Sequence, residues 1–363
     1  MTTTKNNEHK KLNAPNLRFK EFQGEWNSFL INDVCSEFKS GKNIKADSIF
    51  ESGEYPVYGG NGLRGYTSSY NHEGSYVLIG RQGALCGNVR SVYGKTYITE
   101  HAIAVAGNEK SNTNFLHYLF LKMNLGQYSD QSAQPGLAVN KLLKLKVALP
   151  IISEQAKIAK LLSLLDERIA TQNKIIDKLQ SLIKGLRVRL IQIENGDIVH
   201  LGEIARIYQP QTISSTELTE DGFLVYGANG IIGKYKEYNH KTEQICITCR
   251  GNTCGMVNYS KPMSWITGNA MVINTDEHQN KVCKRYLYHY LSAYNFNSLI
   301  SGSGQPQIVR TPLEQLKVTL PTFLEQKQKA TFLDKIQGKI EISNKTLNLY
   351  LQQKQYLLRQ MFI

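Results

Sequence analysis

Two long stretches of the chain place apolar residues at alternating steps of four and three. The first stretch covers residues 158–190, and the second covers residues 333–361. This spacing is the heptad pattern of helices that pack against another helix along one seam. An ordinary core helix that packs only on its own domain rarely keeps this phase for so long. The pattern therefore predicts two long helices that pair with each other.

Each predicted seam has a polar residue at the equivalent place. The first seam consists of Ile158, Leu162, Leu165, Ile169, Gln172, Ile176, Leu179, Ile183, Leu186 and Leu190. The second consists of Leu333, Ile336, Ile340, Ser343, Leu347, Tyr350, Lys354, Leu357 and Met361. Gln172 and Ser343 lie 171 residues apart and occupy matching steps. At ~1.5 Å per residue, each helix spans on the order of 50–60 Å.

Each helix is preceded by a Leu-Pro pair and a polar start signal. Leu149-Pro150 comes before Ser153-Glu154-Gln155, and Leu320-Pro321 comes before Thr322 and Glu325. A serine or threonine followed closely by glutamate or glutamine is typical of a helix N-terminus. We therefore expect Ser153 and Thr322 to begin the two helices.

Short β-like runs and short helices precede each long helix, in the same order. Runs rich in valine, isoleucine and tyrosine, such as 76–79 and 244–248, are broken by glycine and asparagine turns. Amphipathic helices follow at 114–123 and 285–294, and then come polar loops at 129–136 and 301–307. Mixed strands and helices without a βαβ rhythm favour an α+β fold.

The chain repeats itself. The segment Val57-Tyr58-Gly59-Gly60-Asn61-Gly62 recurs as Val225-Tyr226-Gly227-Ala228-Asn229-Gly230, a shift of 168 residues. Further on the shift becomes 171, where Gln134-Pro135 matches Gln305-Pro306. Chance does not keep register over so long a stretch, so the chain is an internal duplication.

The repeat and the seams together predict an α+β protein of two similar globular domains. Two long antiparallel coiled-coil helices join the domains in a pseudo-twofold dumbbell. The expected boundaries are a polar N-terminal tail at 1–16, a first domain at 17–152, a first helix at 153–196, a second domain at 197–321 and a second helix at 322–363.

The charge of the chain favours a polyanionic partner. The 363 residues include 43 Lys and Arg against 30 Asp and Glu, which gives a formal net charge of +13. Basic proteins bind nucleic acid by replacing phosphate counterions, although a charged, soluble surface is the alternative interpretation. No signal peptide or apolar run of ~20 residues is evident, so we expect a cytoplasmic protein with reduced cysteines.

Sequence motifs that would indicate an enzyme are partial, lie in the wrong structural context or are absent. Residues 60–65 match a GxGxxG pattern, but the strand-like residues 66–70 follow where a dinucleotide-binding fold needs a helix. Residues 325–327 resemble half of a nuclease motif, but no Pro-Asp precedes them. The chain also has no Asn-Pro-Pro-Tyr-type tetrapeptide for adenine methylation and no phosphate-binding loop.

The cysteines and histidines do not form a convincing metal motif. Cys246-x-x-Cys249 with Cys254 suggests zinc, but a structural site needs a fourth ligand, which His240 or Cys283 would have to supply. Buried strand thiols are the interpretation that we favour. Partner-bonded or exposed imidazoles account for the histidines. We therefore expect no metal site on this chain.

The ordered set of motifs resembles the specificity subunit of type I restriction-modification enzymes. The resemblance rests on Asn16-Leu17-Arg18-Phe19-Lys20-Glu21-Phe22 with Gly24-Glu25-Trp26, and on the two exits Leu149-Pro150…Glu154-Gln155 and Leu320-Pro321…Glu325-Gln326. It covers nearly the whole chain beyond the first dozen or so residues.

The resemblance implies a non-catalytic DNA-binding subunit. Each domain would be a target recognition domain for one half of a split sequence in double-stranded DNA, and the helices would fix the distance between the halves. They would also dock two modification (methyltransferase) subunits, which restriction (translocase/endonuclease) subunits would join. S-adenosylmethionine, ATP and Mg would bind those partners, and no cofactor would bind this chain.

Polar residues on glycine-flanked loops are the candidates for DNA contact, because arginine, asparagine and glutamine match base edges. In the first repeat they are Asn61, Arg64, Arg81, Gln82, Asn88, Arg90, Gln131 and Gln134. In the second repeat they are Asn229, Lys234, Arg250, Asn252, Asn258, Gln305 and Gln307. Lys95 and Lys261 are expected to contact phosphates rather than bases.

Two other functions remain open from the sequence. One is a stand-alone DNA methyltransferase or nuclease whose motifs have diverged. The other is a coiled-coil scaffold whose domains bind protein, in which case any DNA affinity would be weak and independent of sequence.

Overall fold

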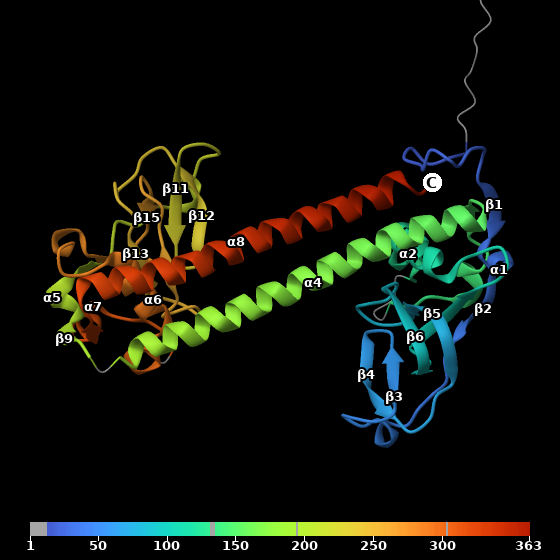
Figure 1. The fold of residues 1–363 in the computed structure, drawn as a ribbon, viewed down its shortest axis with the longest axis horizontal. Helices are drawn as coiled ribbons and strands as arrows, with labels where there is room; N and C mark the ends of the chain where they lie inside the picture. The colour runs from blue at the N-terminus through green and yellow to red at the C-terminus, as the bar shows by residue number, and fades with distance from the viewer. Residues whose placement is uncertain (1–12, 131–134, 194, 303) are drawn as a thin grey trace, which may run out of the picture. The chain divides into compact units, whose positions relative to one another are not determined.

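The computed structural model describes residues 13–130, 135–193, 195–302 and 304–363, and it divides into two compact units (Figure 1). The first unit contains the chain up to residue 171 together with residues 347–363. The second unit contains residues 172–346. Each unit therefore combines one globular domain with segments of both long helices.

The first unit is built on a six-stranded sheet. Its strand order is β2 (Cys35–Ser40), β7 (Ala102–Gly107), β5 (His72–Gly80), β6 (Val89–Ile98), β3 (Tyr55–Gly59), β4 (Gly62–Thr67). All neighbours are antiparallel except β3 and β6, which are parallel. A separate antiparallel pair joins β1 (Asn27–Leu30) to β8 (Lys146–Leu149).

Short helices cover the sheet of the first unit. They are α1 (Ile31–Val34), α2 (Thr113–Met123) and α3 (Val139–Leu142), with 3₁₀ turns at Ala46–Ser48 and Leu125–Tyr128. Asn112 caps α2 by accepting a hydrogen bond from the backbone N–H of Phe115 at 3.1 Å. The predicted helix at 114–123 is thereby confirmed.

The second unit repeats these elements with one break in the sheet. One sheet has the order β10 (Arg206–Tyr208), β16 (Ala270–Asn274), β13 (Ile245–Thr248), β14 (Val257–Tyr259), and another has the order β12 (Gly230–Tyr235), β11 (Phe223–Gly227), β15 (Trp265–Ile266). The strands β14 and β15 correspond to the single strand β6. Pro262 lies between them, and proline cannot donate a ladder hydrogen bond.

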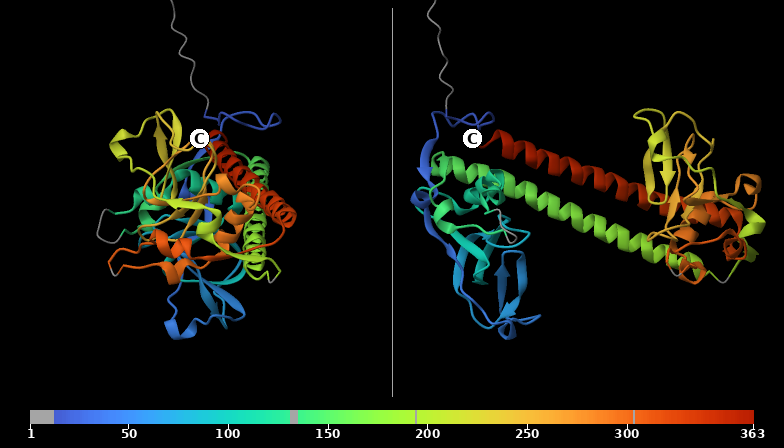
Figure 2. Two further views of the ribbon diagram at one scale, coloured as in Figure 1. Left: turned by 90° about the vertical axis from the view of Figure 1, so that its left-hand side faces the viewer. Right: turned by 180° about the vertical axis from the view of Figure 1, so that it is seen from behind.

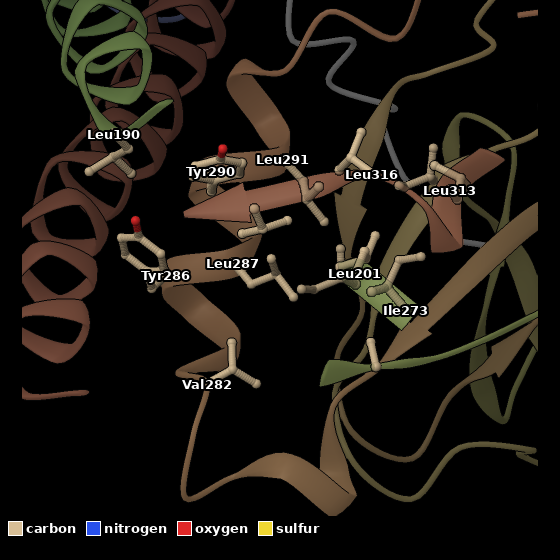
Figure 3. Packing of buried hydrophobic residues seen from close by; sticks show 14 of the residues in the cluster. Leu190, Leu201, Ile273, Val282, Tyr286, Leu287, Tyr290, Leu291, Leu313 and Leu316 are labelled. Carbon is tan, nitrogen blue, oxygen red and sulfur yellow. The ribbon is translucent and has the colours of Figure 1, made fainter. Parts of the chain in front are cut away.

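The other elements of the second unit also have counterparts in the first. The strand β9 (Asp197–His200) pairs antiparallel with β17 (Lys317–Leu320), as β1 pairs with β8. The helices are α5 (Leu201–Ile204), α6 (Lys284–Ala293) and α7 (Arg310–Glu314), with 3₁₀ turns at Ser215–Glu217, Asp276–His278 and Phe296–Leu299. Apolar side chains of α6, including Leu287 and Leu291, point toward Leu201 and Leu316 in the core (Figure 3).

The two long helices are α4 (Ile152–Ile191) and α8 (Phe323–Gln360). Every predicted seam residue is buried or half-buried. In the first unit Lys354 of α8 donates to Asp166 of α4, and in the second unit Gln172 Nε2 donates to the Ser343 carbonyl oxygen at 3.1 Å. Residue numbers fall along α8 as they rise along α4, so the helix segments pair antiparallel within each unit.

The helix starts differ from one another. Thr322 precedes α8 and exchanges hydrogen bonds with Glu325, so that prediction is confirmed. The prediction for Ser153 was wrong, because α4 begins at Ile152 and the Ile151 carbonyl oxygen accepts from the Glu154 N–H at 3.0 Å. The buried carboxylate of Glu154 instead pairs with Arg18 at 2.7 Å. A contact from a distant segment has replaced the local cap.

Candidate DNA interface

The β3–β4 hairpin of the first unit carries Asn61 at its tip and Arg64 on a β-bulge. Tyr58 pairs with Leu63 and Val57 pairs with Gly65, so Arg64 is an extra residue without a direct partner. A bulge turns its side chain out of the regular strand alternation. The hairpin lies on the side of the sheet away from α4 (Figure 2).

The hairpin of the second unit has the same bulge at the same place. Tyr226 pairs with Ile231 and Val225 pairs with Gly233, which leaves Ile232 as the extra residue. The 168-residue shift therefore matches Arg64 with Ile232 in backbone geometry as well as in sequence. Both side chains are exposed.

The loop after β5 is joined to a second loop by backbone hydrogen bonds. Gly83 N–H donates to the Pro135 carbonyl oxygen at 3.0 Å, and Leu137 N–H donates to the Arg81 carbonyl oxygen at 2.9 Å. In the second unit Gly251 N–H donates to Pro306 at 3.0 Å in the same way. The repeated Gln-Pro motif thus has a structural role, because its proline carbonyl oxygen holds the loop that follows β5 or β13.

These loops enclose a hollow of about 300 Å³ in the first unit. It is lined by Gly59, Gly60, Asn61, Arg64, Gln82, Gly83 and His101. His101 Nδ1 lies 3.3 Å from Gln82 Oε1. The hollow therefore brings together polar side chains from separate segments, such as Asn61 and His101, which lie 40 residues apart in sequence.

The other candidates of the first unit lie at three different places. The Arg90 guanidinium lies beside Gly62, where an added methyl group would approach it to 3.2 Å. Lys95 lies five residues further along β6, roughly 17 Å away, and stacks over the Tyr70 ring. Asn88 is exposed and Arg81 is half-buried in the loop after β5, whereas Gln131 and Gln134 lie outside the described residues.

The candidates of the second unit are less concentrated. Arg250 and Gln307 form a β-bridge and line a hollow of about 330 Å³, as Gln82 bridges Gly136 in the first unit. Asn229 accepts a hydrogen bond from Thr253 at the hairpin tip. Lys234 is half-buried and pairs with Asp221 at 3.4 Å, which differs from the free loop cation that we expected.

Three further candidates of the second unit complete the set. Asn252 and Gln305 are exposed on loops, and Asn258 is half-buried on β14, where it matches Arg90 by the 168-residue shift. Within the described ranges, Arg64, Arg90 and Arg250 form no ion pair with a carboxylate. Their guanidinium groups are thus available to an external acceptor.

Sequence analysis missed His101, which lines the hollow of the first unit. It corresponds to Asn269 in the second repeat, between the matching pairs Thr99/Thr267 and Ala102/Ala270. The signal in the sequence was a position that differs between the two repeats and lies between two positions that are identical in both. His101 also contacts Glu100, with 3.2 Å between Nε2 and Oε1.

The buried histidines have structural partners in the same unit. His240 Nδ1 lies 2.6 Å from Asn239 Oδ1, and its Nε2 lies 2.8 Å from the Tyr208 hydroxyl. Burial lowers the pKa of His240 to about 4. The first unit repeats the arrangement with His72 and Asn71, also 2.6 Å apart. The prediction of partner-bonded imidazoles is confirmed for these two histidines.

Of the four cysteines of the second unit, Cys246 and Cys249 are buried, as we expected, whereas Cys254 and Cys283 are half-buried. Cys246 lies in β13, and burial raises the pKa of its thiol to about 12. Cys249 follows β13 and accepts a hydrogen bond from Gln209 Nε2 at 3.1 Å. Among the residues that the structure describes, no three His, Cys, Asp or Glu side chains are grouped as a metal site requires.

A buried glutamine fastens each long helix to its own domain. Gln155 Nε2 donates to the carbonyl oxygens of Lys110 and Pro150, and its Oε1 accepts from Asn112 N–H at 2.8 Å. Gln326 makes the corresponding three bonds with Lys281, Pro321 and Cys283. The repeated Glu-Gln motif therefore fixes the helix against the turn that precedes α2 or α6.

A second apolar stripe on α8 faces outward. In the first unit, Leu349 and Tyr356 are one seven-residue step apart and are 62% and 58% exposed. Seven residues complete two helical turns, so these side chains lie on one face. Across the described part of the chain, no helix combines the length and apolarity needed to cross a membrane.

Comparisons with known proteins agree with this architecture. Residues 23–181 and 194–351 each match the family described as type I restriction modification DNA specificity domain. The type I restriction enzyme EcoprrI specificity subunit of Escherichia coli is 43% identical over 154 residues, which cover 41% of this chain and 38% of that protein. A protein of Haemophilus influenzae, also named as a type I restriction enzyme specificity subunit, is 23% identical over 91% of this chain and 92% of its own length.

Solved structures share the fold. The type I restriction-modification S subunit from M. genitalium superposes with a TM-score of 0.78 at 18% identity, over 96% of this chain and 99% of that chain. The family model matches twice, and each matched segment covers one structural repeat and part of the long helix that follows it. The chain belongs to the family of type I restriction-modification specificity subunits, which are DNA-recognition proteins with two recognition domains.

Proposed function

We propose that this chain recognises a two-part sequence in double-stranded DNA, with one part bound by each domain. The observation that carries the proposal is the repetition of one scaffold with different exposed side chains at equivalent positions, such as Arg64 and Ile232. Two similar scaffolds bind two DNA segments in a similar manner, while their different side chains select different bases. The net charge of +13 supports attraction to the phosphate backbone.

The long helices set the distance between the two DNA segments in this proposal. α4 has 40 residues and α8 has 38, so each spans on the order of 60 Å at 1.5 Å per residue. The bonds of Gln155 and Gln326 support a fixed angle between each helix and the recognition loops of its own domain. A flexible linker would lose conformational entropy when both DNA segments are bound. A stiff helix pair avoids most of this cost, because it is already ordered in the folded chain.

The chemistry belongs to partner subunits in this proposal. Two modification subunits dock on the helices, and restriction subunits join them. S-adenosylmethionine, ATP and Mg bind those partners and not this chain. The exposed apolar pair of Leu349 and Tyr356 in the first unit supports docking, because an apolar helix face gains free energy when another helix covers it. A solved chain with a TM-score of 0.53 and 16% identity, over 93% of this chain, comes from work on complex assembly of a type I R-M system.

Exchange of one domain tests the proposal. Residues 18–149 are replaced by the corresponding domain of another specificity subunit, and the chain is expressed with its modification subunits. Sequencing of methylated bases in the host genome should show a two-part motif in which only one part has changed. The spacer between the parts should stay the same.

Other outcomes would favour the alternatives. Methylation or cleavage by the purified chain alone would indicate an enzyme. The absence of any methylated two-part motif, together with weak and sequence-independent DNA binding, would indicate a scaffold. A change in both parts of the motif would contradict the assignment of one part to each domain.

A further inference from the structure

The bulge residue of the recognition hairpin is the clearest chemical difference between the two domains. Arg64 and Ile232 occupy the same extra position of β4 and β12, opposite the same partner strands. Both side chains also lie across the same glycine. A methyl group added to Gly59 would approach Arg64 Cδ to 2.9 Å, and one added to Gly227 would approach Ile232 Cγ2 to 2.9 Å.

This contact means that the glycine forms a flat support for whichever side chain the bulge carries. The aliphatic stem of Arg64 packs on Gly59, and its guanidinium is left at the hollow with Asn61 and Gln82. The stem is therefore restricted before any ligand arrives, which lowers the entropy cost of binding. Ile232 offers only an apolar surface at the same place, beside exposed Ile231.

We propose that this bulge position determines one base pair in each half of the DNA target. Arg64 selects guanine, because a guanidinium donates two parallel hydrogen bonds to the N7 and O6 atoms. Ile232 selects thymine, because an apolar side chain gains contact with the C5-methyl group and cannot satisfy the acceptors of guanine. This inference rests on the proposed function, and it adds the bases and the residues that select them.

Single-residue exchange between the repeats tests this inference. The variants are Arg64→Ile and Ile232→Arg, each within the complete complex with its modification subunits. Each variant takes a side chain that the other repeat already carries at the same bulge, so both are expected to fold. Thermal unfolding of each variant checks this before any DNA measurement.

The measurement is the relative methylation rate on duplexes that carry every single-base-pair change in the motif. Wild type should require guanine at one position in one half of the motif and thymine at one position in the other half. Arg64→Ile should lower the preference for guanine by about 10- to 100-fold at that position alone, since a bidentate contact contributes ~1–3 kcal/mol. Ile232→Arg should lower the preference for thymine in the other half.

Lys95→Ile is the matched control. Lys95 is an exposed cation of the same domain, roughly 17 Å from Arg90 along β6. As a phosphate contact it should slow methylation of all sequences equally and leave the motif unchanged.

Three outcomes would overturn the inference. They are an equal loss on all sequences for Arg64→Ile, an unchanged motif for both variants, and a change in the same half of the motif for both variants. The proposed function fails separately, if the wild-type complex methylates no two-part motif at all.

Discussion

Two buried histidines hold corresponding turns in the two domains. The Nδ1 atoms of His72 and His240 contact the asparagine that precedes each of them, and His240 Nε2 accepts from the Tyr208 hydroxyl. The His240 network needs a neutral imidazole, because a protonated Nε2 cannot accept from the Tyr208 hydroxyl. Burial disfavours the charged form as well, which lowers the pKa values of both histidines.

Acidification should therefore destabilise the second domain through His240. Its pKa is about 4 in the folded chain and about 6.5 in the unfolded chain, so the unfolded state binds more protons between these values. Stability is then lost as the pH falls below about 6.5. Between pH 7 and pH 5 we expect a loss of about 2 kcal/mol from this group, measured by urea unfolding at both pH values.

His240→Gln should have a smaller loss of stability over the same range. The control is His200→Gln, which changes a more exposed histidine of the same domain. This control keeps His240, so it should keep the loss of about 2 kcal/mol that His240 causes. An equal dependence in His240→Gln and the wild type would show that His240 does not control it.

At the level of elements, the helix–domain joint depends on one buried glutamine in each repeat. Gln326→Leu removes three hydrogen bonds and leaves the Cys283 N–H without its partner. We expect a loss of about 2–4 kcal/mol in the free energy of unfolding, since each buried bond contributes ~1 kcal/mol. Gln328→Leu makes the same change at an exposed position of the same helix and should shift stability by less than about 0.5 kcal/mol. Similar losses of stability in both variants would show that the hydrogen bonds of Gln326 do not stabilise the contact between the helix and its domain.

The helices were predictable because their information is periodic and local. A seam such as Ile176, Ile183 and Leu190 shows its buried face at fixed steps, whatever it packs against. The start of α4 was not predictable in this way, because Arg18 reaches the buried Glu154 from a segment 136 residues away. A tertiary contact of this kind leaves no trace in the local pattern.

The candidate site was predictable only in part for the same reason. The hairpin tips and Arg64 follow from the repeat and from glycine turns. The hollow of the first unit joins three separate segments, so the proximity of Gln82 to His101 needed the folded structure. Lys234 looked like a free loop cation in sequence, but strand pairing places it beside Asp221.

A matched insertion in both helices tests their role as a spacer. Seven residues that continue the heptad pattern are inserted after Thr171 in α4 and after Thr346 in α8. Two turns add ~10 Å to each helix and keep the seam in phase. The methylated motif should keep both halves and gain a spacer longer by about three base pairs, at ~3.4 Å each.

Insertion into α4 alone is the control for that experiment. It shifts one seam against the other and should destabilise their pairing, with loss of methylation. An unchanged spacer after the matched insertion would contradict the assignment of distance to the helices.

At the scale of the whole chain, the C-terminal residues complete the core of the N-terminal domain. The Phe362 ring stacks on Phe115 at 5.1 Å between centroids and meets the edge of Trp26 at 6.4 Å. Met361 is buried in the same cluster. The Leu17 N–H also donates to the Gln360 carbonyl oxygen at 2.9 Å.

Phe362→Ala should therefore destabilise the first unit, although residue 362 is far from most of that unit in sequence. Removal of a buried phenylalanine costs about 3–5 kcal/mol. In a Trp265→Phe background, Trp26 is the remaining tryptophan, and its fluorescence reports unfolding of the first unit. Ile363→Ala changes the exposed last residue and should have little effect. If Phe362→Ala unfolded at the same urea concentration as this control, the C-terminus would not be part of that core.

This arrangement also affects how the first domain folds during translation. The first domain leaves the ribosome before the second, but it lacks Met361 and Phe362 until those two residues have been translated. A chain that ends at a premature stop therefore has a first domain whose aromatic core lacks Phe362, even when the second domain is complete. Such fragments should be degraded rather than persist as half-length proteins that compete for the same DNA.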